Sequence, residues 1–455
     1  MAYIDNNPLS AEEFEQLLTT VVSVEPSPRI VVATSGGADS MALCLLSHRW
    51  AENSGGKCYG LIVDHGLRSG SDREAALVAD WLTSLGIQAH VLKWEGAKPK
   101  TGIQAAAREA RYSLIQSWCI KRNLCDVLLA HHRDDQAETF LMRLGRRSGI
   151  DGLSAMAPVL HRSGVRLVRP LLNVPKARLV STLREFGHSW IEDPSNHDPA
   201  YTRTRLRGAM PLLADIGINA EGLALTARRM ARAREALDYY ANELIRSAVE
   251  FHTSGYCWVN RDTFISAPAE IGLRVLSRVI SAVGTTRNRP RYGRVERLFT
   301  DLVNNAMGNG RTLAGCRIIE RGGRILVCRE IRGIGDPVTL KPGECRRWDA
   351  RFDVRLRAAS ATRAAGVYEV RQLGQEGWRT IASHLEKPIN QNIKIIPLAA
   401  RLTLPALWDQ EGLVDVPHLN FHRIRSKFGL DVHFAPQWPL EILPFPVVSA
   451  DTPPI

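Results

Sequence analysis

The sequence predicts an α/β fold, in which a doubly wound, Rossmann-like parallel sheet precedes a helical segment and a small α+β module. In about the first 200 residues, short apolar runs alternate with amphipathic stretches of helical length. Parallel strands that helices cover on both faces are continuously apolar, so this alternation favours a doubly wound sheet. The pattern then changes to long helical periodicity and, from about residue 331, to short strand-like runs with Pro and Trp. We therefore expect domains at residues 1–215, 216–330 and 331–455.

Five strands are expected in the first domain. The first run, RIVVAT, is rich in β-branched residues and leads directly into glycines, and the second, CYGLIV, is equally apolar. Three further apolar runs complete the sheet. The predicted strands are Arg29–Thr34, Cys58–Val63, Ile87–Trp94, Cys125–Ala130 and Val165–Leu172.

Helical patterns lie between and after these strands. Apolar residues recur along the first pattern, Gly86 ends the second, and Pro175 begins the last. Alternation of strand and helix is what a crossover-connected parallel sheet requires. The predicted helices are Asp39–Glu52, Arg73–Leu85, Ile103–Lys121, Asp134–Leu144 and Pro175–Phe186.

The middle segment begins with a long helical stretch from Glu221 to Val249. Its leucines and a methionine recur every seven residues and form one narrow apolar stripe, which indicates core packing. Residues 331–340 indicate a hinge into the last module. A basic cluster lies between, consisting of Arg287, Arg289, Arg291, Arg294 and Arg297.

The charge is distributed unevenly along the 455 residues. Of the formal net charge of +12, residues 1–215 contribute +2, residues 216–330 contribute +7 and residues 331–455 contribute +3. Arginine outnumbers lysine by 49 to 10, and it suits phosphate forks and base stacking better than lysine does. A basic middle segment indicates a polyanionic partner such as nucleic acid, with a solvated surface as the alternative.

Composition excludes several classes of protein. Hydrophobic residues make up 45% and charged residues 23% of the chain, unlike disordered, collagen-like or coiled-coil sequences. The absence of a long apolar run and of a basic, apolar leader predicts a cytoplasmic protein without membrane helices. The eight cysteines form no C-x-x-C pair, which argues against zinc knuckles and iron–sulfur clusters and for reduced, mostly buried thiols.

The clearest chemical signal is the loop Ser35-Gly36-Gly37-Ala38-Asp39-Ser40, which follows a buried strand and opens a helix. The glycines expose backbone N–H groups, the serines add hydroxyl donors, and the helix N-terminus adds partial positive charge. Asp39 could hold Mg²⁺ on the same phosphates. The loop therefore predicts a phosphate cradle; the alternative is a serine-capped glycine turn.

Two further polar motifs end strands and so reach the same sheet edge. Asp64 and His65 end the second strand, where they either lie beside a nucleotide or form a polar turn. Asp135 and Glu138 share a helix face and can bind Mg²⁺ or a cationic substrate. The alternative is that these acids only stabilise the first helical turn through the helix dipole. The preceding His131-His132 pair lacks the i, i+4 spacing of H-E-x-x-H, which argues against zinc.

Arginines mark two more candidate contacts. Arg108 and Arg111 fall on one helix face, where they either reach a phosphate or base or form surface salt bridges. Arg203, Arg205 and Arg207 alternate, so an extended segment would point all three the same way. Such a segment would be a phosphate comb or a solvated strand.

The S-G-G-x-D-S loop resembles the signature of the PP-loop ATP pyrophosphatases, which split ATP between the α- and β-phosphates and adenylate a substrate. All the motifs in this order closely resemble the tRNA(Ile)-lysidine synthetase family over about residues 29–207. Thr204 departs from the R-N-R-x-R run expected of the family, and residues 331–455 resemble its C-terminal module loosely. Further matching elements are Arg146–Leu153 (R-x-x-G-x-x-G-L), Arg169–Leu172 and Trp190–Asn196.

The resemblance implies ligation of L-lysine to C2 of the wobble cytidine of a CAU-anticodon tRNA(Ile), through an adenylated cytidine and with release of AMP and pyrophosphate. ATP and Mg²⁺ are the implied cofactors. The implied ATP site is Ser35–Ser40 with Asp64 and His65, and Asp39 and Asp135 are implied as catalytic residues that serve the metal. The implied lysine ligands are Asp135 and Glu138, and the implied tRNA contacts are Arg108, Arg111, Arg203, Arg205 and Arg207.

Three other functions stay open at this point. A tRNA thiolase of the same superfamily would need a reactive cysteine or a C-x-x-C cluster site, and an amide ligase would leave the basic middle domain unexplained. A non-catalytic RNA-binding protein would not need Asp39 and Asp135. A homodimer is plausible, although no motif indicates one.

Overall fold

The protein is described here by a computed structural model, which covers residues 6–22, 26–96, 98–99, 101–162, 164–192, 198, 200, 202–285, 289–358, 367–383, 395–424, 426–438 and 440. These residues form two compact units, the first ending at Glu235 and the second beginning at Ala236. The second unit contains most of the predicted middle and last domains. The division into three domains at residues 215 and 330 remains a prediction. Within the part of the chain that the structure describes, no helix is both long enough and apolar enough to span a membrane.

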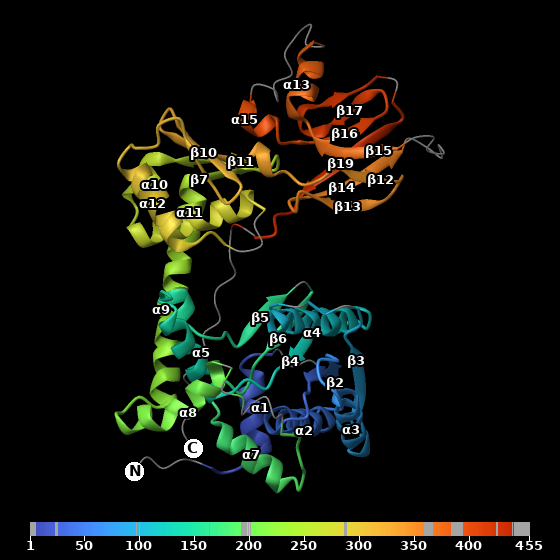
Figure 1. The fold of residues 1–455 in the computed structure, drawn as a ribbon, viewed down its shortest axis with the longest axis vertical. Coiled ribbons are helices and arrows are strands. Elements are labelled where there is room, and N and C mark those ends of the chain that lie inside the picture. Colours follow the sequence, from blue (N-terminus) through green and yellow to red (C-terminus); the bar gives the residue numbers. More distant parts are fainter. Residues whose placement is uncertain are drawn as a thin grey trace. The chain divides into compact units, whose positions relative to one another are not determined.

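The first unit is built on a six-stranded sheet with the order β3-β2-β1-β4-β6-β5 (Figure 1). Neighbouring strands are parallel except for β5, which runs antiparallel to β6. All five predicted strands are present, and β5 is an additional edge strand. The strands are β1 Arg29–Ala33, β2 Lys57–Asp64, β3 Gln88–Lys93, β4 Asp126–Leu128, β5 Val159–Arg162 and β6 Val165–Val168.

Helices cover both faces of this sheet because alternate strand residues point to opposite sides. Ile30 and Val32 of β1 pack in a core with residues of α1, α2, α3 and α7, whereas Val31 packs in a second core with residues of α4. The predicted doubly wound α/β fold is therefore confirmed. The helices are α1 Ala11–Thr19, α2 Ala38–Asn53, α3 Ser71–Ser84, α4 Ile103–Ile120, α5 Arg133–Gly145, α6 Ile150–Leu153, α7 Lys176–Glu185 and α8 Thr202–Asp215.

The strand order places the candidate motifs at one point of the sheet. The chain leaves β1 to build β2 and β3 on one side, and β4 and β6 on the other. Ligands of open α/β sheets bind where the order reverses, outside the carboxyl ends of the strands. The loop after β1 and the motif after β4 both lie at this reversal.

The extended arginine comb predicted for Arg203, Arg205 and Arg207 is wrong, because these residues belong to helix α8. The stretch is rich in Arg, Leu, Ala and Met, which are strong helix formers, and alternate arginines fit a helix as readily as a strand. Helical spacing puts Arg203 and Arg207 on one face and Arg205 on another. Residues 193–196 of the preceding motif, Trp190–Asn196, and Tyr201, which precedes the arginine run, lie outside the described residues.

The second unit contains a five-stranded antiparallel sheet that the sequence analysis did not predict. Its order is β7-β8-β11-β10-β9, and α11 and α12 pack with it in one apolar core. The predicted long helix is confirmed as α9. Helix α9 is Ala220–Ala248, and its residues from Ala236 onward belong to this unit. The other elements are β7 Val249–His252, β8 Tyr256–Asn260, α10 Arg261–Ser266, α11 Ala269–Val283, α12 Tyr292–Val303, β9 Arg311–Leu313, β10 Cys316–Arg321 and β11 Arg324–Arg329.

The last segment has the expected α+β character. A five-stranded sheet, β12-β15-β16-β17-β18, and a three-stranded sheet, β13-β14-β19, share a core that includes Trp348, Phe352 and Leu407. A 3₁₀ turn at Ile331–Gly333 occupies the predicted hinge. The elements are β12 Val338–Leu340, β13 Cys345–Trp348, β14 Phe352–Ala358, β15 Tyr368–Gln372, α13 Gly374–Ser383, α15 Leu398–Arg401, β16 Pro405–Asp409, β17 Gly412–Val416, the 3₁₀ turn Pro417–Leu419, β18 Phe421–His422 and β19 Phe428–Phe434.

All eight cysteines are free thiols, and six of them are buried. Burial raises the pKa of the Cys119, Cys316 and Cys328 thiols to about 12, which keeps them protonated and unreactive. The expectation of mostly buried cysteines is confirmed.

Candidate active site

The loop between β1 and α2 has the backbone shape of a phosphate cradle. Gly36 adopts a φ of +86°, and a Cβ there would lie 2.5 Å from Cγ2 of Val78, so the position requires glycine. The Ser35 amide donates to Ser40 Oγ at 3.1 Å, and that hydroxyl donates to the Gly37 carbonyl at 3.0 Å. No side chain caps the N-terminus of α2, so its first N–H groups remain available to an anion.

Asp39 lies in the first turn of α2 and presents an unused oxygen. Its Oδ1 atom is buried and has no hydrogen-bond partner among the described residues. Its Oδ2 atom lies 3.5 Å from Nε2 of His132 and 3.9 Å from Nζ of Lys176. A buried carboxylate oxygen without a partner is costly unless a cation or donor arrives, so this atom fits a metal ligand.

His132 joins the two acidic motifs and was missed as a functional residue by the sequence analysis. Its side chain is 2% exposed, and Nε2 lies 3.5 Å from Asp39 Oδ2 and 3.4 Å from Asp135 Oδ2. Burial lowers the pKa of His132, but hydrogen bonds to Asp134 and Asp39 and the charges of Asp135 and Asp39 raise it to about 10. The imidazolium therefore holds the predicted catalytic pair together. The sequence signal that could have found it was its position between β4 and α5, two residues before Asp134 and three before Asp135.

Asp135 and Glu138 share one face of α5, as predicted, and both are buried. Asp135 Oδ2 accepts from the His132 amide at 3.1 Å, which caps the helix. Glu138 Oε1 accepts from Arg207 Nε at 2.5 Å, and Arg203 Nε lies 3.7 Å from Oε2. Two of the three predicted α8 arginines thus pair with a predicted lysine ligand.

The remaining α8 arginine points elsewhere. Arg205 Nη2 donates a hydrogen bond to Thr202 Oγ1 of the same helix at 3.4 Å, and Arg205 does not pair with Glu138. Burial lowers the pKa of Arg207, but its hydrogen bond to Glu138 and the charges of Glu138 and Asp135 raise it overall. Arg207 is therefore a permanent cation at this position.

Asp64 and His65 have separate partners at the end of β2. Asp64 Oδ1 accepts from the Gly66 amide at 2.9 Å and from Ser71 Oγ at 2.7 Å, so it shapes the turn into α3. His65 Nε2 lies 3.1 Å from Nη2 of Arg111. Burial and the Arg111 charge lower the pKa of His65 to about 4, so the neutral ring accepts a hydrogen bond from the guanidinium. This contact brings two of the predicted motifs together.

The neighbouring Arg108 lies 5.2 Å from the centre of the Tyr112 ring, a cation–π distance. Nearby, buried Arg169 donates from Nε to Nδ1 of His131 at 3.3 Å. Burial, with the charge of Arg169, lowers the pKa of His131 to about 3. The two adjacent histidines thus differ in protonation, since His131 is neutral and His132 is positively charged.

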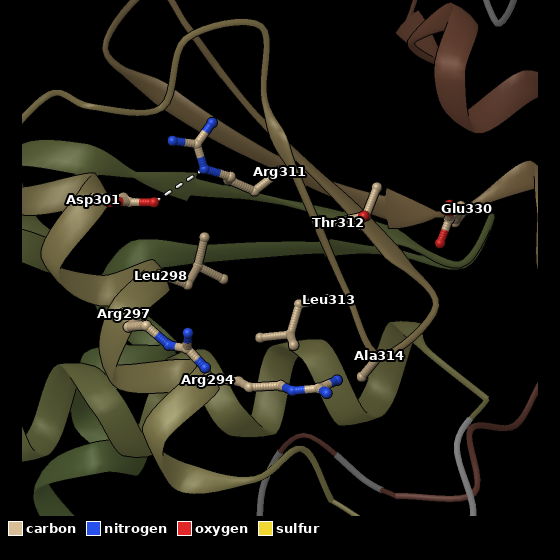
Figure 2. A pocket seen from close by; sticks show the side chains of 9 residues that line it. All are labelled: Arg294, Arg297, Leu298, Asp301, Arg311, Thr312, Leu313, Ala314 and Glu330. Carbon is tan, nitrogen blue, oxygen red and sulfur yellow. Dashed lines mark hydrogen bonds and ion pairs between the residues drawn. The ribbon is translucent and has the colours of Figure 1, made fainter.

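A second candidate surface lies in the second unit, where α12 and β9 enclose a cavity of about 630 Å³ (Figure 2). Figure 2 shows Arg294 extending from α12 toward Leu313 and Ala314. Arg311 donates to Asp301 Oδ2 at 3.0 Å, which neutralises that acid. Two members of the predicted basic cluster, Arg294 and Arg297, line the cavity. Arg287 lies outside the described residues.

Comparison with known proteins agrees with this geometry. The sequence model of the PP-loop domain family matches residues 8–213. The tRNA(Ile)-lysidine synthase of Bradyrhizobium diazoefficiens is 42% identical over 346 residues, which cover 71% of this chain and 95% of that protein. The corresponding synthase of Ruegeria pomeroyi is 37% identical over 415 residues, covering 90% of this chain and 93% of its own. The chain belongs to the tRNA(Ile)-lysidine synthase family.

Membership of the lysidine synthase family makes the chain an ATP-dependent ligase. The synthase of Rhodopseudomonas palustris is 40% identical over 354 residues, which cover 77% of this chain and 100% of that protein. The PP-loop match covers the cradle at residues 35–40 and the acidic motif after β4.

Proposed function

We propose that this enzyme joins L-lysine to C2 of the wobble cytidine in a CAU-anticodon tRNA(Ile), forming lysidine in the cytoplasm. The observation that carries the proposal is the arrangement around His132. Its Nε2 atom lies 3.5 Å from Oδ2 of Asp39, in α2, and 3.4 Å from Oδ2 of Asp135, in α5. Nucleotide and substrate groups would thus meet at the reversal point of the sheet.

In the first step, the C2 oxygen of the cytidine attacks the α-phosphorus of ATP and pyrophosphate leaves. The uncapped N-terminus of α2 and the amides of the Ser35–Ser40 loop would carry the phosphate charge. In the second step, the neutral ε-amine of lysine attacks C2, the C–O bond breaks, and AMP leaves with the former C2 oxygen. Adenylation is needed because that oxygen is otherwise a poor leaving group.

Asp39 and Asp135 would hold Mg²⁺, which spreads charge from the leaving pyrophosphate. The residues fit this ion, because Asp39 Oδ1 is buried without a partner and carboxylate oxygens are preferred magnesium ligands. Asp64 and His65 would border the nucleotide at the end of β2, with Arg111 fixing the orientation of the His65 ring.

Asp135 and Glu138 would bind the α-ammonium group of lysine, because both carboxylates are buried on one helix face. Arg108, Arg111 and the arginines of α8 would contact the anticodon arm of the tRNA. In the second unit, the cavity with Arg294 and Arg297 would bind backbone phosphates, as proteins that recognise folded RNA by shape commonly do.

The test is incubation of the protein with ATP, Mg²⁺, labelled L-lysine and a CAU-anticodon tRNA(Ile) transcript, followed by measurement of label in the RNA. We expect ATP-dependent label, and a loss of at least about a hundredfold in Asp39→Asn. Asp80→Asn, which changes an exposed aspartate on α3, is the matched control and should keep full activity.

The pattern of failure separates the alternatives. ATP turnover with bound tRNA but no lysine label would indicate another nucleophile, as in a thiolase or an amide ligase. Tight tRNA binding without ATP turnover would indicate a non-catalytic RNA-binding protein.

A further inference from the structure

The cavity between α12 and β9 is lined by more than the cations that a backbone phosphate needs (Figure 2). Its volume of about 630 Å³ lies within the range of about 300–1,000 Å³ that is usual for small-molecule sites. Charged side chains of both signs and several apolar side chains line it. The internal partners of the charged groups decide which of them a ligand can use.

The arginines of the cavity differ in how far they are committed to internal partners. Arg311 donates to Asp301 Oδ2 at 3.0 Å and to two backbone carbonyls at 2.8 and 3.1 Å. Arg297 donates from Nε to a carbonyl of its own helix at 3.1 Å, which leaves its Nη groups to a ligand. Within the described residues, the Arg294 side chain makes no hydrogen bond or ion pair. Arg294 and Arg297 are therefore the cations that a phosphate can use.

The acids of the cavity differ in the same way. Asp301 is neutralised by Arg311. Glu330 directly follows β11, and its carboxylate makes no hydrogen bond or ion pair with any residue that the structure describes. Since an unpaired carboxylate repels a phosphate bound nearby, a groove for backbone phosphates alone would be better without it. The ligand should therefore carry N–H donors as well as a phosphate.

Part of the cavity wall is apolar. Leu298 of α12 is buried, and Leu313 and Ala314 form the end of β9 and the start of the turn that follows it. A flat group of low polarity can cover such side chains and remove them from water, whereas a charged phosphodiester cannot. This wall suits the face of a nucleobase.

We propose that this cavity is a guanine-nucleotide site. Arg294 and Arg297 would bind the phosphate, and Leu298 and Leu313 would cover the base. Glu330 would accept from the ring N1–H and the N2 amino group of guanine, which match the two carboxylate oxygens as a guanidinium does. The other RNA bases offer N–H donors at one position only. The occupant is a free guanine nucleotide or an unpaired guanosine of bound RNA, which share this chemistry.

The test is equilibrium dialysis of the full-length protein with labelled GMP, while a saturating non-hydrolysable ATP analogue occupies the nucleotide site of the first unit. GMP should bind at least about tenfold more tightly than IMP, which lacks the N2 amino group and so loses one hydrogen bond to a charged acceptor. AMP, CMP and UMP should also bind more weakly than GMP. Equal wild-type affinities for GMP and IMP, or no binding of GMP at millimolar concentration, would overturn the proposal.

Two variants assign the roles of the charged groups. Glu330→Gln should bring the ratio of GMP to IMP affinity down to about 1. Arg294→Gln should weaken GMP binding about tenfold but leave the affinity for guanosine, which has no phosphate, unchanged. Glu296→Gln is the matched control, because it removes the same charge from an exposed position of α12 that does not line the cavity. A folded Glu330→Gln protein that still prefers GMP to IMP as strongly as the wild type would overturn the proposal.

Saturating tRNA(Ile) distinguishes the two sources of the ligand. Release of GMP by tRNA, with weaker tRNA binding in Glu330→Gln, would assign the cavity to a guanosine of the RNA. Retention of GMP, or its release with tighter tRNA binding in Glu330→Gln, would assign it to a free guanine nucleotide, because loss of a negative charge favours contacts to phosphates alone.

The site goes beyond the proposed function, since it adds a base to the phosphate contact and does not involve lysine. Failure of the lysine-labelling assay, with GMP still preferred to IMP, would refute the proposed function and leave this site in place. Lysine labelling by a protein that binds GMP and IMP equally would refute this site alone.

Discussion

Replacing Asp349 by asparagine should strongly destabilise the second unit, because this carboxylate serves two buried arginines. Asp349 Oδ2 lies 3.1 Å from Nε of Arg329 and 2.8 Å from Nε of Arg351, and Oδ1 lies 3.1 Å from Nη2 of Arg329. Arg329 ends β11 of the first sheet in this unit, whereas Asp349 and Arg351 form the turn between β13 and β14. The substitution therefore removes a charge that joins two parts of the unit.

The magnitude follows from burial. The side chains of Arg329 and Arg351 are 2% and 1% exposed, so neither guanidinium can be solvated when its counter-ion is lost. Burial lowers the pKa of Arg351 to about 10 even with Asp349 present, which shows how poorly this position tolerates charge. Breaking a buried ion pair costs about 3–5 kcal/mol, and asparagine keeps the shape while losing the charge.

The assay is urea unfolding of the full-length protein, monitored by tryptophan fluorescence because Trp348 is adjacent and fully buried. We expect the unfolding transition of this unit to lose about 3 kcal/mol with an unchanged m value. Asp353→Asn is the control in the same hairpin, since its partner Arg347 is 38% exposed and the pair should contribute less than about 1 kcal/mol. Equal losses in the two variants would refute the reasoning.

Three further outcomes are expected. Gly36→Ala should lower the free energy of unfolding by about 2–3 kcal/mol, because Gly36 has a positive φ and a Cβ there would clash with Val78. Gly37→Ala should fold normally but raise the KM for ATP about tenfold in an ATP-turnover assay. Burial and the Arg351 charge lower the pKa of His418 to about 4. Between about pH 6.5 and 4 the unfolded chain therefore binds one more proton than the folded protein, so the free energy of unfolding should fall by about 2–3 kcal/mol as the pH is lowered. Urea titrations of His418→Gln should show a smaller fall over this range. Arg294→Gln and Arg297→Gln should each weaken tRNA binding and reduce the slope of log K against log salt by about 1 in filter binding.

Each of these outcomes has a contrary result. Equal stability of the two glycine variants would show that the left-handed conformation at Gly36 carries no strain. If the free energy of unfolding changes by the same amount between pH 6.5 and pH 4.5 in the wild type and in His418→Gln, this would contradict a buried neutral His418. An unchanged salt slope would remove the cavity on α12 from the tRNA contacts.

Motifs at strand ends were the part of the site that could be predicted. The loop after β1 and the acidic motif after β4 were recognisable because a buried strand followed by glycines or acids is a local pattern. Parallel strands direct their carboxyl ends to one edge, so local patterns were enough to expect that Asp39 and Asp135 would meet. The structure brings both carboxylates to His132.

Short elements and ambiguous periods were the parts that failed. Strands β7 to β11 are only three to six residues long, and β9, β10 and β11 carry exposed arginines. Their apolar runs therefore contain at most four residues. Arg203, Arg205 and Arg207 suggested a period of two, but local helix propensity and the pairing of two of them with Glu138 decided for a helix.

By itself, the sequence determined the doubly wound sheet, the phosphate cradle and the residue types gathered at its edge, because these depend on local periodicity and on strand direction. Tertiary structure alone decided which charges pair. Arg207 and Glu138 are 69 residues apart, and Arg329 and Asp349 are 20 apart. The strength of such pairs, and the protonation of His132, depend on distance and burial in space, which no local pattern of residues records.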